Sequence, residues 1–336
     1  MSDKPLVSVI VPAYNAASYL EDCLASLVAQ TYPRLEIVVM DDASTDATPV
    51  IAQKYSSRVR LVRQPRNVGQ FPNVNAGIAL AAGELVAVFH ADDAYAPNIL
   101  EQAVAAFQRH PEARAVFCLD ELMDPHGRVY GRVSLPPGIP ANCPLPFDIV
   151  LNGLLTYRNR FLRTPGTVVR RDAYAAAGPY RADCGTAGDL EMWTRIARLG
   201  PIVILDRHLF RYRHTPTSVE HSYQQLRTEP EQFFTLIDNI LASGGRQQAT
   251  AAALRAYEAH RTEDRIIRGI RAYILGDRAV MRAAIRHARV RTLLQSSRVQ
   301  RSRLIVLLAA LRVLGLVPHF PGVAGLFRRR WVRRWA

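Results

Sequence analysis

The alternation of two kinds of segment between residues 6 and 119 constrains the fold of this chain more than any other feature. Short runs of apolar and β-branched residues are each followed by a stretch with apolar residues at helical spacing. The strand-like runs are 6–11, 35–40, 59–62 and 85–89. Continuous apolar strands that alternate with helices are typical of a mainly parallel sheet covered on both faces. The sequence therefore predicts an α/β fold.

The helix expected after the first strand has the most detailed local pattern. Ser18 and Glu21 have the spacing of a capping box, and Leu20, Leu24 and Leu27 fall on one helical face. The other helices are expected from the mid-forties to about residue 55 and over 72–82, 187–199, 249–275 and 278–295. Repeated prolines between residues 120 and 163 predict an irregular segment that faces the substrate.

Polar residues follow each of the first four predicted strands. Asn15 follows the first strand, Asp41 and Asp42 the second, residues 66–69 the third, and residues 92–93 the fourth. The carboxyl ends of parallel strands meet at one edge of a sheet, and ligands of such sheets bind at that edge. We therefore expect these four loops to form one site.

The adjacent carboxylates Asp92 and Asp93 predict the chemistry of that site. They follow a short apolar strand and precede a turn that ends at Pro97. Hard oxygen ligands favour Mg²⁺ or Mn²⁺, and such an ion can also hold phosphate oxygens. This arrangement suits a sugar donor whose leaving group is a nucleoside diphosphate.

Five motifs in order give the chain a family resemblance. They are VIVPAYN at 9–15, DDASTD at 41–46, RNVG at 66–69, ADD at 91–93 and GDLEMW at 188–193. Together they resemble glycosyltransferase family 2, whose members are inverting enzymes with the GT-A fold, and the resemblance covers about residues 5–215. It implies a nucleotide-diphospho-sugar transferase-like, mainly parallel sheet flanked by helices, here followed by an α-helical C-terminal region.

The resemblance also implies roles for individual residues. Pro12, Tyr14 and Asn15 would border the nucleotide, while Asp41 would accept a hydrogen bond from the nucleobase and Asp42 would support that loop. Arg66, Asn67 and Gly69 resemble the loop that packs against the base and ribose. Asp92 would contact the ribose or the metal, and Asp93 would ligate a Mn²⁺ or Mg²⁺ ion that bridges the two phosphates.

Asp189 resembles the general base of the family. An inverting transfer needs a carboxylate on the face opposite the leaving group, to take the proton of the acceptor hydroxyl. Glu191 competes for this role, and Asp189 could instead only cap the helix that it begins. Arg211, Arg213 and His214 are candidates for phosphate or acceptor contacts, with a surface position as the alternative for His214.

Two positions depart from the family pattern. His90 stands where many relatives have the first carboxylate of an Asp-x-Asp-Asp motif, and Gly188 stands where many have Glu before the base. These departures motivate a second hypothesis, in which the chain is a catalytically impaired nucleotide-binding or membrane-scaffold protein on the same fold. Transfer of a sugar to any acceptor would exclude that hypothesis.

Charge divides the chain into a neutral body and a basic tail. The residues after 230 hold 20 of the 43 Lys and Arg but only 6 of the 29 Asp and Glu. The apolar run 304–317 is shorter than the roughly 20 residues that span a bilayer, and the ending FRRRWVRRW at 327–335 favours an anionic lipid surface over nucleic acid. We expect a catalytic domain over 1–230, a helical extension over 231–300 and a membrane-association tail over 301–336.

The expected partners follow from this division. They are a nucleotide diphosphate sugar, most simply a UDP-sugar, and a lipid-linked or polysaccharide acceptor near the membrane. The N-terminus runs into a strand without the pattern of a secretory signal. The expected location is therefore cytoplasmic, with peripheral binding to the inner face of the cell membrane, as in biosynthesis of cell-envelope polysaccharide.

Overall fold

The computed structural model describes residues 4–215, 227–287 and 305–313. The chain forms two compact units, one of residues 1–150 with 159–214 and one of residues 151–158 with 215–336. Three predicted segments lie wholly or partly outside the described residues. They are the expected helix 278–295 after residue 287, the apolar run 304–317 except for 305–313, and the Arg/Trp ending at 327–335.

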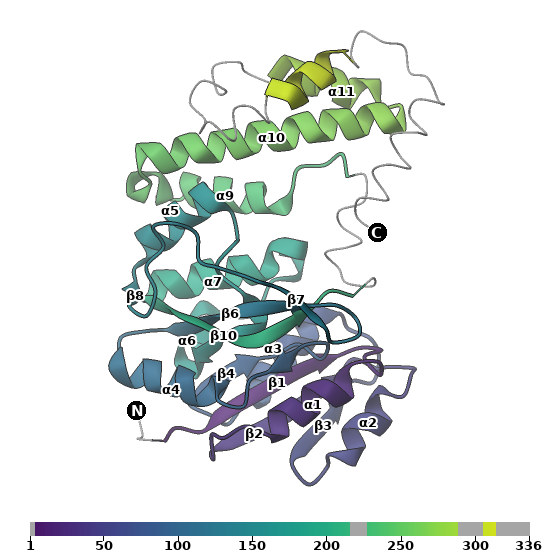
Figure 1. Cartoon of the computed structure of the whole chain (residues 1–336), viewed down its shortest axis with the longest axis vertical. Coiled ribbons are helices and arrows are strands. Elements are labelled where there is room, and N and C mark those ends of the chain that lie inside the picture. The colour runs from purple at the N-terminus through teal and green to yellow at the C-terminus, as the bar shows by residue number, and fades with distance from the viewer. Residues whose placement is uncertain (1–3, 216–226, 288–304, 314–336) are drawn as a thin grey trace. The chain divides into compact units, whose positions relative to one another are not determined.

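The first unit is built on one mixed sheet with strand order β3-β2-β1-β4-β9-β6-β10-β5, in which β7 pairs with β6 and β8 with β10 (Figure 1). Its strands are β1 (Val7–Ala13), β2 (Leu35–Asp41), β3 (Val59–Arg63), β4 (Leu85–Val88), β5 (Ala94–Tyr95), β6 (Ala115–Met123), β7 (Val129–Arg132), β8 (Pro144–Leu145), β9 (Val168–Arg170) and β10 (Ile202–Arg213). Strands β3, β2, β1 and β4 are parallel neighbours, as the sequence predicts. Strand β9 runs antiparallel to both β4 and β6, and β10 is parallel to β6. The carboxyl ends of β1–β4, β6 and β10 therefore lie at the same edge.

Helices cover both faces of this sheet (Figure 1). They are α1 (Leu20–Val28), α2 (Thr48–Lys54), α3 (Gln70–Leu80), α4 (Ile99–Arg109), α6 (Arg171–Ala177) and α7 (Gly188–Leu199). Helices α1, α2 and α4 share one buried apolar cluster with the alternate residues Val7, Val9 and Val11 of β1. On the opposite face α3 packs so closely that a Cβ on Gly77 would lie 2.4 Å from Ile10. This mixed sheet flanked by helices confirms the expected fold class.

Two local expectations were wrong. Helix α1 begins at Leu20 after Tyr19, and no side chain caps it, so the Ser18–Glu21 capping box does not form. The backbone N–H of Leu20 instead donates to the carbonyl of Ala16. The region from 120 to 163 is also more regular than expected, because it contains strands β7 and β8 and the helix α5 (Phe147–Tyr157).

The second unit is helical. It contains α9 (Gln232–Ala242), α10 (Ala251–Leu275), α11 (Arg278–His287) and a helix over 305–313. Helix α10 ends at Leu275 and is capped by Gly276, whose φ of +79° is left-handed, so a turn at Gly276-Asp277 separates the two helices that the sequence predicts. Leu308 and Leu311 are buried in a cluster with residues of α10 and α11. Within the described residues, no helix is both long enough and apolar enough to cross a bilayer.

Candidate active site

The loop that follows β4 brings three possible metal ligands together. One ligand atom from each of His90, Asp92 and Asp93 lies within 4.8 Å of the other two. Asp93 is fully buried; its Oδ1 accepts a hydrogen bond of 2.8 Å from the backbone N–H of Arg213, while Oδ2 has no hydrogen-bond partner among the described residues. A buried carboxylate oxygen without a donor is costly unless a cation or ligand satisfies it.

The charge of Asp93 is unfavourable in the metal-free protein. Burial raises the pKa of Asp93 well above its ordinary value, and the neighbouring charge of Asp92 raises it further. The N–H of Arg213 and the charge of Arg163 oppose this shift only in part. The carboxylates of Asp92 and Asp93 and the imidazole of His90 therefore form a ligand set that fits a divalent cation. His90 faces this cluster despite its departure from the acidic pattern.

Arg213 supports the loop after β4 that holds the metal-ligand candidates. Its side chain is 3% exposed, and its guanidinium donates to the carbonyls of Asp92 at 2.8 Å and Pro125 at 3.2 Å and to Asp22 at 3.0 Å. The guanidinium also lies 4.9 Å from the centre of the Tyr19 ring. These contacts fix the backbone of the loop to α1 and to the segment after β6.

Asp189 lies on the same site, at the beginning of α7. Burial raises its pKa, whereas the nearby charge of His90 and a hydrogen bond from the Thr164 hydroxyl lower it. The Trp193 Nε1–H donates to Thr164 Oγ1 at 3.2 Å. The chain Trp193–Thr164–Asp189 therefore orients a carboxylate toward the loop that holds the metal-ligand candidates.

The two other notable residues of α7 have structural surroundings. Glu191 is 7% exposed and pairs with Arg195 at 2.8 Å, so this carboxylate is committed to an ion pair. A Cβ on Gly188 would lie 2.4 Å from the ring of Phe71, at the start of α3. Gly188 is therefore required by close packing between α7 and α3, and a Glu side chain at this position would displace Phe71.

The loops after β1 and β2 hold each other in place. Asn15, with φ of +49°, accepts from Thr45 N at 2.9 Å, and its own N–H donates to Ser44 Oγ at 2.9 Å. Asp41 is fully buried; its Oδ1 accepts from Ser44 N, and its Oδ2 lies 3.1 Å from Arg63 Nε without hydrogen-bond geometry. Asp41 thus keeps one buried oxygen that accepts no hydrogen bond among the described residues and lies against the Arg63 guanidinium.

Asp42 connects β2 to the loop after β3. Its two oxygens accept from Val68 N at 2.8 Å and Gly69 N at 2.9 Å, so the carboxylate holds the backbone of the loop after β3. Gly69 has φ of +89°, and open space surrounds the position of an added Cβ. The backbone conformation is therefore what requires glycine there in the free protein. Arg66 and Asn67 are exposed on this loop.

The remaining predicted residues line the outside of the site. Pro12 is half-buried in β1, and Tyr14 is 52% exposed after its end. Arg211 pairs with Glu121 at 3.3 Å and is 55% exposed. The exposed His214 ring hydrogen-bonds the Tyr130 hydroxyl, and so it is a surface residue in the free protein.

Comparison with known proteins identifies this arrangement. The family model described as Glycosyl transferase family 2 matches residues 8–135, which include β1–β6 and the loops with Asp41, Asp42, Asp92 and Asp93. The chain carries a family 2 glycosyltransferase domain. The Asp189 helix and Thr164 lie beyond the matched residues.

Relatives in sequence are glycosyltransferases from several bacteria. An uncharacterized glycosyltransferase of Haemophilus influenzae is 28% identical over 235 residues, which are 68% of this chain and 72% of that protein. TuaG of Bacillus subtilis, assigned to teichuronic acid biosynthesis as a glycosyltransferase, is 39% identical over 102 residues, which are 30% of this chain and 40% of that protein. An uncharacterized glycosyltransferase of Rickettsia felis is matched over 32% of its length.

Solved structures share the fold of the family 2 domain. TarS of Staphylococcus aureus, residues 1–349 with UDP, has a TM-score of 0.60 at 19% identity and covers 96% of this chain and 91% of that one. The mannosyltransferase PcManGT of Pyrobaculum calidifontis, with GDP-Man and Mn²⁺, has a TM-score of 0.52 at 20% identity, with coverage of 93% and 87%. These likenesses confirm a GT-A fold.

Sequence reasoning missed three residues of the first unit, namely Asp120, Arg163 and Thr164. Asp120 in β6 is fully buried and pairs with Arg163 at 2.9 Å, and Thr164 follows directly. The signal for Asp120 was an acidic residue directly after the apolar run 115–119. Nothing in the sequence pointed to Thr164, because its contact with Asp189 joins distant parts of the chain.

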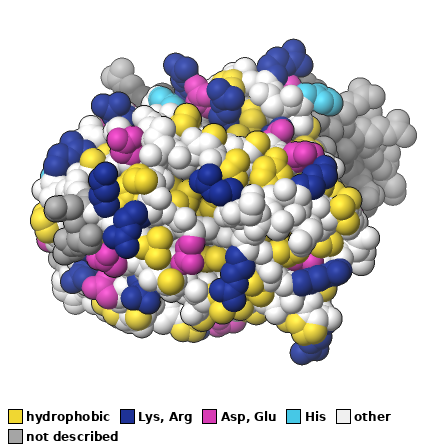
Figure 2. All heavy atoms as spheres, turned by 90° about the horizontal axis from the view of Figure 1, so that it is seen from below, with side chains coloured by type: hydrophobic (Ala, Val, Ile, Leu, Met, Phe, Trp, Pro, Cys, Tyr) yellow, Lys and Arg dark blue, Asp and Glu magenta, His cyan; other side chains and the backbone are white. Residues whose placement is uncertain are grey.

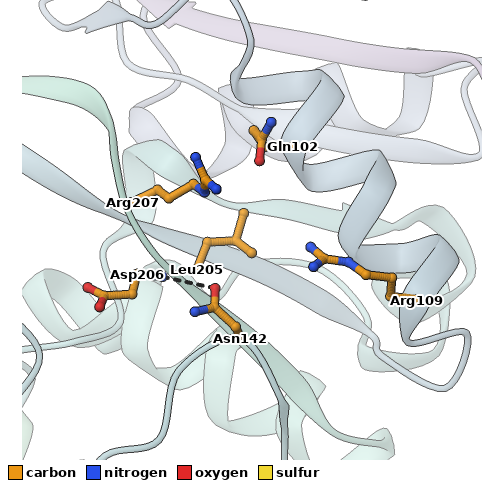
Figure 3. A pocket seen from close by; sticks show the side chains of 6 residues that line it. All are labelled: Gln102, Arg109, Asn142, Leu205, Asp206 and Arg207. Atoms are coloured by element: carbon orange, nitrogen blue, oxygen red, sulfur yellow. Dashed lines mark hydrogen bonds between the residues drawn. The ribbon is translucent and has the colours of Figure 1, made fainter.

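A separate cavity of about 450 Å³ lies between α4 and the bulge in β10 (Figure 3). Arg207, Gln102 and Arg109 point into one space, while Asp206 points away and its N–H donates to Asn142 Oδ1 at 3.3 Å. None of the predicted site residues lines this cavity. The candidate site is therefore the edge formed by the strand ends.

Proposed function

We propose that this chain is an inverting glycosyltransferase that moves one sugar from a nucleotide diphosphate sugar, UDP-linked in the simplest case, to a hydroxyl of a lipid-linked or polysaccharide acceptor. One observation carries the proposal: Asp93, which has a buried oxygen without a hydrogen-bond partner in the described part of the chain, clusters with Asp92 and His90 as possible metal ligands, and the nearby charge of His90 lowers the pKa of Asp189. A cation site and a candidate base thus share one edge of the sheet.

The loops after β1, β2 and β3 support binding of the nucleoside. The buried Asp41 oxygen that accepts no hydrogen bond suits a nucleobase N–H, and the exposed Tyr14, Arg66 and Asn67 can border the base and ribose. Asp42, Asn15 and Gly69 hold the backbone of these loops. The bound nucleotides of the structural neighbours, UDP in TarS and GDP-Man in PcManGT, lend support to this class of donor.

The proposed metal site and Asp189 have different roles: the first acts on the leaving group and the second on the acceptor hydroxyl. When bound by Asp92, Asp93 and His90, Mg²⁺ or Mn²⁺ would neutralise negative charge on the departing diphosphate. Because Mg²⁺ prefers oxygen ligands, the imidazole of His90 favours Mn²⁺. Asp189 takes the proton of the acceptor hydroxyl as the new bond forms, and Thr164 holds its carboxylate for that transfer. Arg211 and His214 can turn toward phosphate or acceptor, since both are exposed.

The acceptor class rests on the C-terminal part of the chain. The sequence after residue 230 is strongly basic, and the described helix over 305–313 leaves Ile305, Val306 and Val313 exposed. Such a region can hold a catalytic domain of residues 1–230 at an anionic membrane surface, with 231–300 as a helical extension and 301–336 as the membrane-association tail. The relative assigned to teichuronic acid biosynthesis supports a cell-envelope polysaccharide.

The test is an assay of nucleoside diphosphate release from UDP-glucose and UDP-GlcNAc, with Mn²⁺ or with EDTA, in the presence of bacterial membrane extract as acceptor source. We expect release that depends on Mn²⁺ and that falls at least about 100-fold in Asp93→Ala and in Asp189→Ala. Matched substitution of Asp172, an exposed carboxylate on α6, should leave the rate unchanged. Full turnover in both active-site variants would refute the assignment.

Binding separates this function from that of a catalytically impaired protein. A thermal-shift panel of UDP, GDP, dTDP and CMP with and without Mn²⁺ identifies the nucleotide. A protein that binds a nucleotide but neither hydrolyses nor transfers from any of its sugar conjugates is the impaired protein of the second hypothesis. His90 lies in the metal cluster and Gly188 serves packing, so neither departure removes a group that the proposed reaction needs.

A further inference from the structure

The family 2 domain contains a second buried acidic residue at the same edge of the sheet. Asp120 lies in β6, is fully buried, and faces Phe210 of β10 in the strand register. Its Oδ2 accepts a hydrogen bond of 2.9 Å from Arg163 Nη2. Its Oδ1 is buried and has no hydrogen-bond partner in the described part of the chain.

Arg163 is the partner of Asp120 and is equally unsatisfied. Its side chain is 24% exposed, and its guanidinium lies 4.9 Å from the centre of the Tyr212 ring. Among the described residues, the buried Nε of Arg163 has no acceptor. Stacking on an aromatic ring fixes the plane of a guanidinium and so directs its N–H groups.

The pair lies next to both halves of the proposed reaction centre. Asp120 and Arg163 both act on the pKa of Asp93, and Tyr212 directly precedes Arg213, whose N–H binds Asp93. Arg163 directly precedes Thr164, which hydrogen-bonds Asp189. Asp120 and Arg163 therefore lie near the metal-ligand candidates, and Arg163 adjoins in sequence the residue that contacts the proposed base.

The strand order places the pair on a defined side of the metal loop. The nucleoside loops follow β1, β2 and β3, which all lie on one side of β4, whereas β6 and β10 lie on the other side beyond β9. A sugar attached to the diphosphate leads away from the nucleoside. Groups at the ends of β6 and β10 therefore meet the transferred sugar or the sugar that accepts it.

The carboxylate distinguishes this pair from the structural pair Glu191–Arg195, whose arginine also has a buried Nε without a partner in the described part of the chain. Buried Asp–Arg pairs repay the cost of desolvation only when further hydrogen bonds satisfy the remaining oxygens and N–H groups. Here one oxygen of Asp120 and the Nε of Arg163 are left without partners next to a reaction centre. An adjacent acceptor and donor of this kind match the paired hydroxyls of a sugar ring, which can donate to a carboxylate and accept from a guanidinium.

We propose that Asp120 and Arg163 form a sugar-hydroxyl subsite of this enzyme, with Tyr212 fixing the plane of Arg163. The proposal rests on the proposed glycosyl transfer and names the residues that select the sugar. The hydroxyls can belong to the sugar of the donor or to the terminal sugar of the acceptor, and the experiment separates these two sources.

The test compares Asp120→Asn and Arg163→Lys in the full chain. Each variant keeps the size of its side chain but loses part of the hydrogen-bonding pattern. The matched controls are Asp172→Asn and Arg114→Lys, because Arg114 and Asp172 form a surface pair of the same type at 3.4 Å, and Arg114 directly precedes β6. Thermal melting reports whether each variant folds; Arg163→Lys, at a partly exposed position, keeps the test available if Asp120→Asn does not.

Three measurements are made with Mn²⁺: the affinities for UDP, UDP-glucose and UDP-GlcNAc; hydrolysis of the two sugar nucleotides; and transfer to a panel of p-nitrophenyl glycosides. We expect the affinity for UDP to stay within about twofold of wild type. If the subsite holds the donor sugar, affinity for a sugar nucleotide falls about 10- to 100-fold. If it holds the acceptor, hydrolysis stays unchanged and KM for the glycoside rises by a similar factor.

Folded variants that keep sugar-nucleotide affinity, hydrolysis and glycoside KM within twofold of wild type would overturn the subsite while leaving the proposed function intact. An equal loss of affinity for UDP would also overturn it, since the pair would then act on the nucleotide site as a whole. A wild-type protein that binds no nucleotide and hydrolyses no sugar nucleotide contradicts the proposed function, and the subsite with it.

Discussion

The buried carboxylate of Asp93 lowers the stability of the metal-free fold. Its carboxylate is buried beside Asp92 with one oxygen unpartnered. Its pKa in the folded protein is raised above the ordinary value near 3.8, so the folded protein binds this proton more tightly than the unfolded chain does. The metal-free fold therefore loses stability as pH rises from about 4 toward the raised pKa of Asp93.

We predict that Asp93→Asn makes the metal-free protein more stable at pH 7.5 than wild type, because it removes a buried charge. The gain should shrink as pH falls toward 4 and vanish below 3.8, where the wild-type carboxyl becomes protonated in the unfolded chain as well as in the folded protein. Wild type should gain thermal stability on addition of Mn²⁺, whereas the variant should gain little. Melting curves over a pH series with Mn²⁺ or EDTA check this, and a metal-free variant less stable than wild type at pH 7.5 contradicts it.

Thr164 acts on Asp189, the proposed base, through one hydrogen bond. The hydroxyl of Thr164 stabilises the charged form of Asp189 and so lowers the pKa of that carboxyl against the effect of burial. Since proton transfer requires the ionised carboxylate, loss of the hydroxyl should move the acidic limb of the rate profile to higher pH.

We predict that Thr164→Val raises the pH at which kcat reaches half of its plateau and lowers the plateau about 10-fold, with unchanged affinity for UDP. A pH profile of kcat for wild type, Thr164→Val and Thr164→Ser measures this. Thr164→Ser keeps the hydroxyl and should retain the wild-type profile. An identical profile in Thr164→Val would show that the hydroxyl does not act on the base.

At the scale of elements, packing between α7 and α3 explains why glycine stands at position 188. The sequence presents Gly188 as the loss of an acidic residue, but the structure places the ring of Phe71 where a side chain would begin. Phe71 also stacks on Tyr180, with ring centres 5.6 Å apart. The start of α7, which carries Asp189, is thus positioned by its contact with α3.

We predict that Gly188→Ala lowers the free energy of unfolding by about 1 to 3 kcal/mol, because the added methyl group overlaps the ring of Phe71. The backbone of Gly188 is helical, with φ of −63°, so steric overlap is the source of the cost. Chemical denaturation measures the change. Gly131→Ala is the control, since its Cβ would meet Leu122 at an ordinary 3.5 Å. The double variant with Phe71→Leu should recover stability, and a stable single variant contradicts the packing argument.

The sequence predicted helices and strands most accurately where a single pattern of apolar residues dominates. The four parallel strands were anticipated because each is a continuous apolar run. Helix α5 was missed because prolines flank it, although Pro146 directly precedes its first turn, a position that tolerates proline. The capping box at Ser18 failed because Ala16 O supplies the acceptor that begins α1.

At the scale of the whole molecule, charge is distributed unevenly. On the face shown in Figure 2, Lys and Arg side chains are interspersed with Asp and Glu and do not form a patch of one sign. The basic excess instead belongs to the sequence after residue 230. Helical geometry puts the exposed Val306 and Val313 on the side of their helix opposite to the buried Leu308 and Leu311, with the exposed Ile305 at the border of the buried side.

We predict that the full chain co-sediments with vesicles of 30% phosphatidylglycerol and is released by 0.5 M NaCl, because exposed charges are screened at high salt. Replacing the arginines at 328–330 and 333–334 by Gln should weaken binding at least about 100-fold, at about 1 kcal/mol for each charge near the surface. The same positions changed to Lys should still bind. Equal binding to pure phosphatidylcholine, or by the Gln variant, contradicts an electrostatic tail.

The sequence alone determined the parallel strands and the acidic loops at their ends, because apolar periodicity and strand direction are local properties of the chain. The tertiary structure decided which of those groups remain available. Arg213 was predicted to contact ligand but is engaged by Asp92, Pro125 and Asp22. The pairs Asp120–Arg163 and Thr164–Asp189 appear only when segments 43 and 25 residues apart fold onto one edge of the sheet. Sequence spacing carries no information on such contacts, since packing among distant elements brings their side chains together.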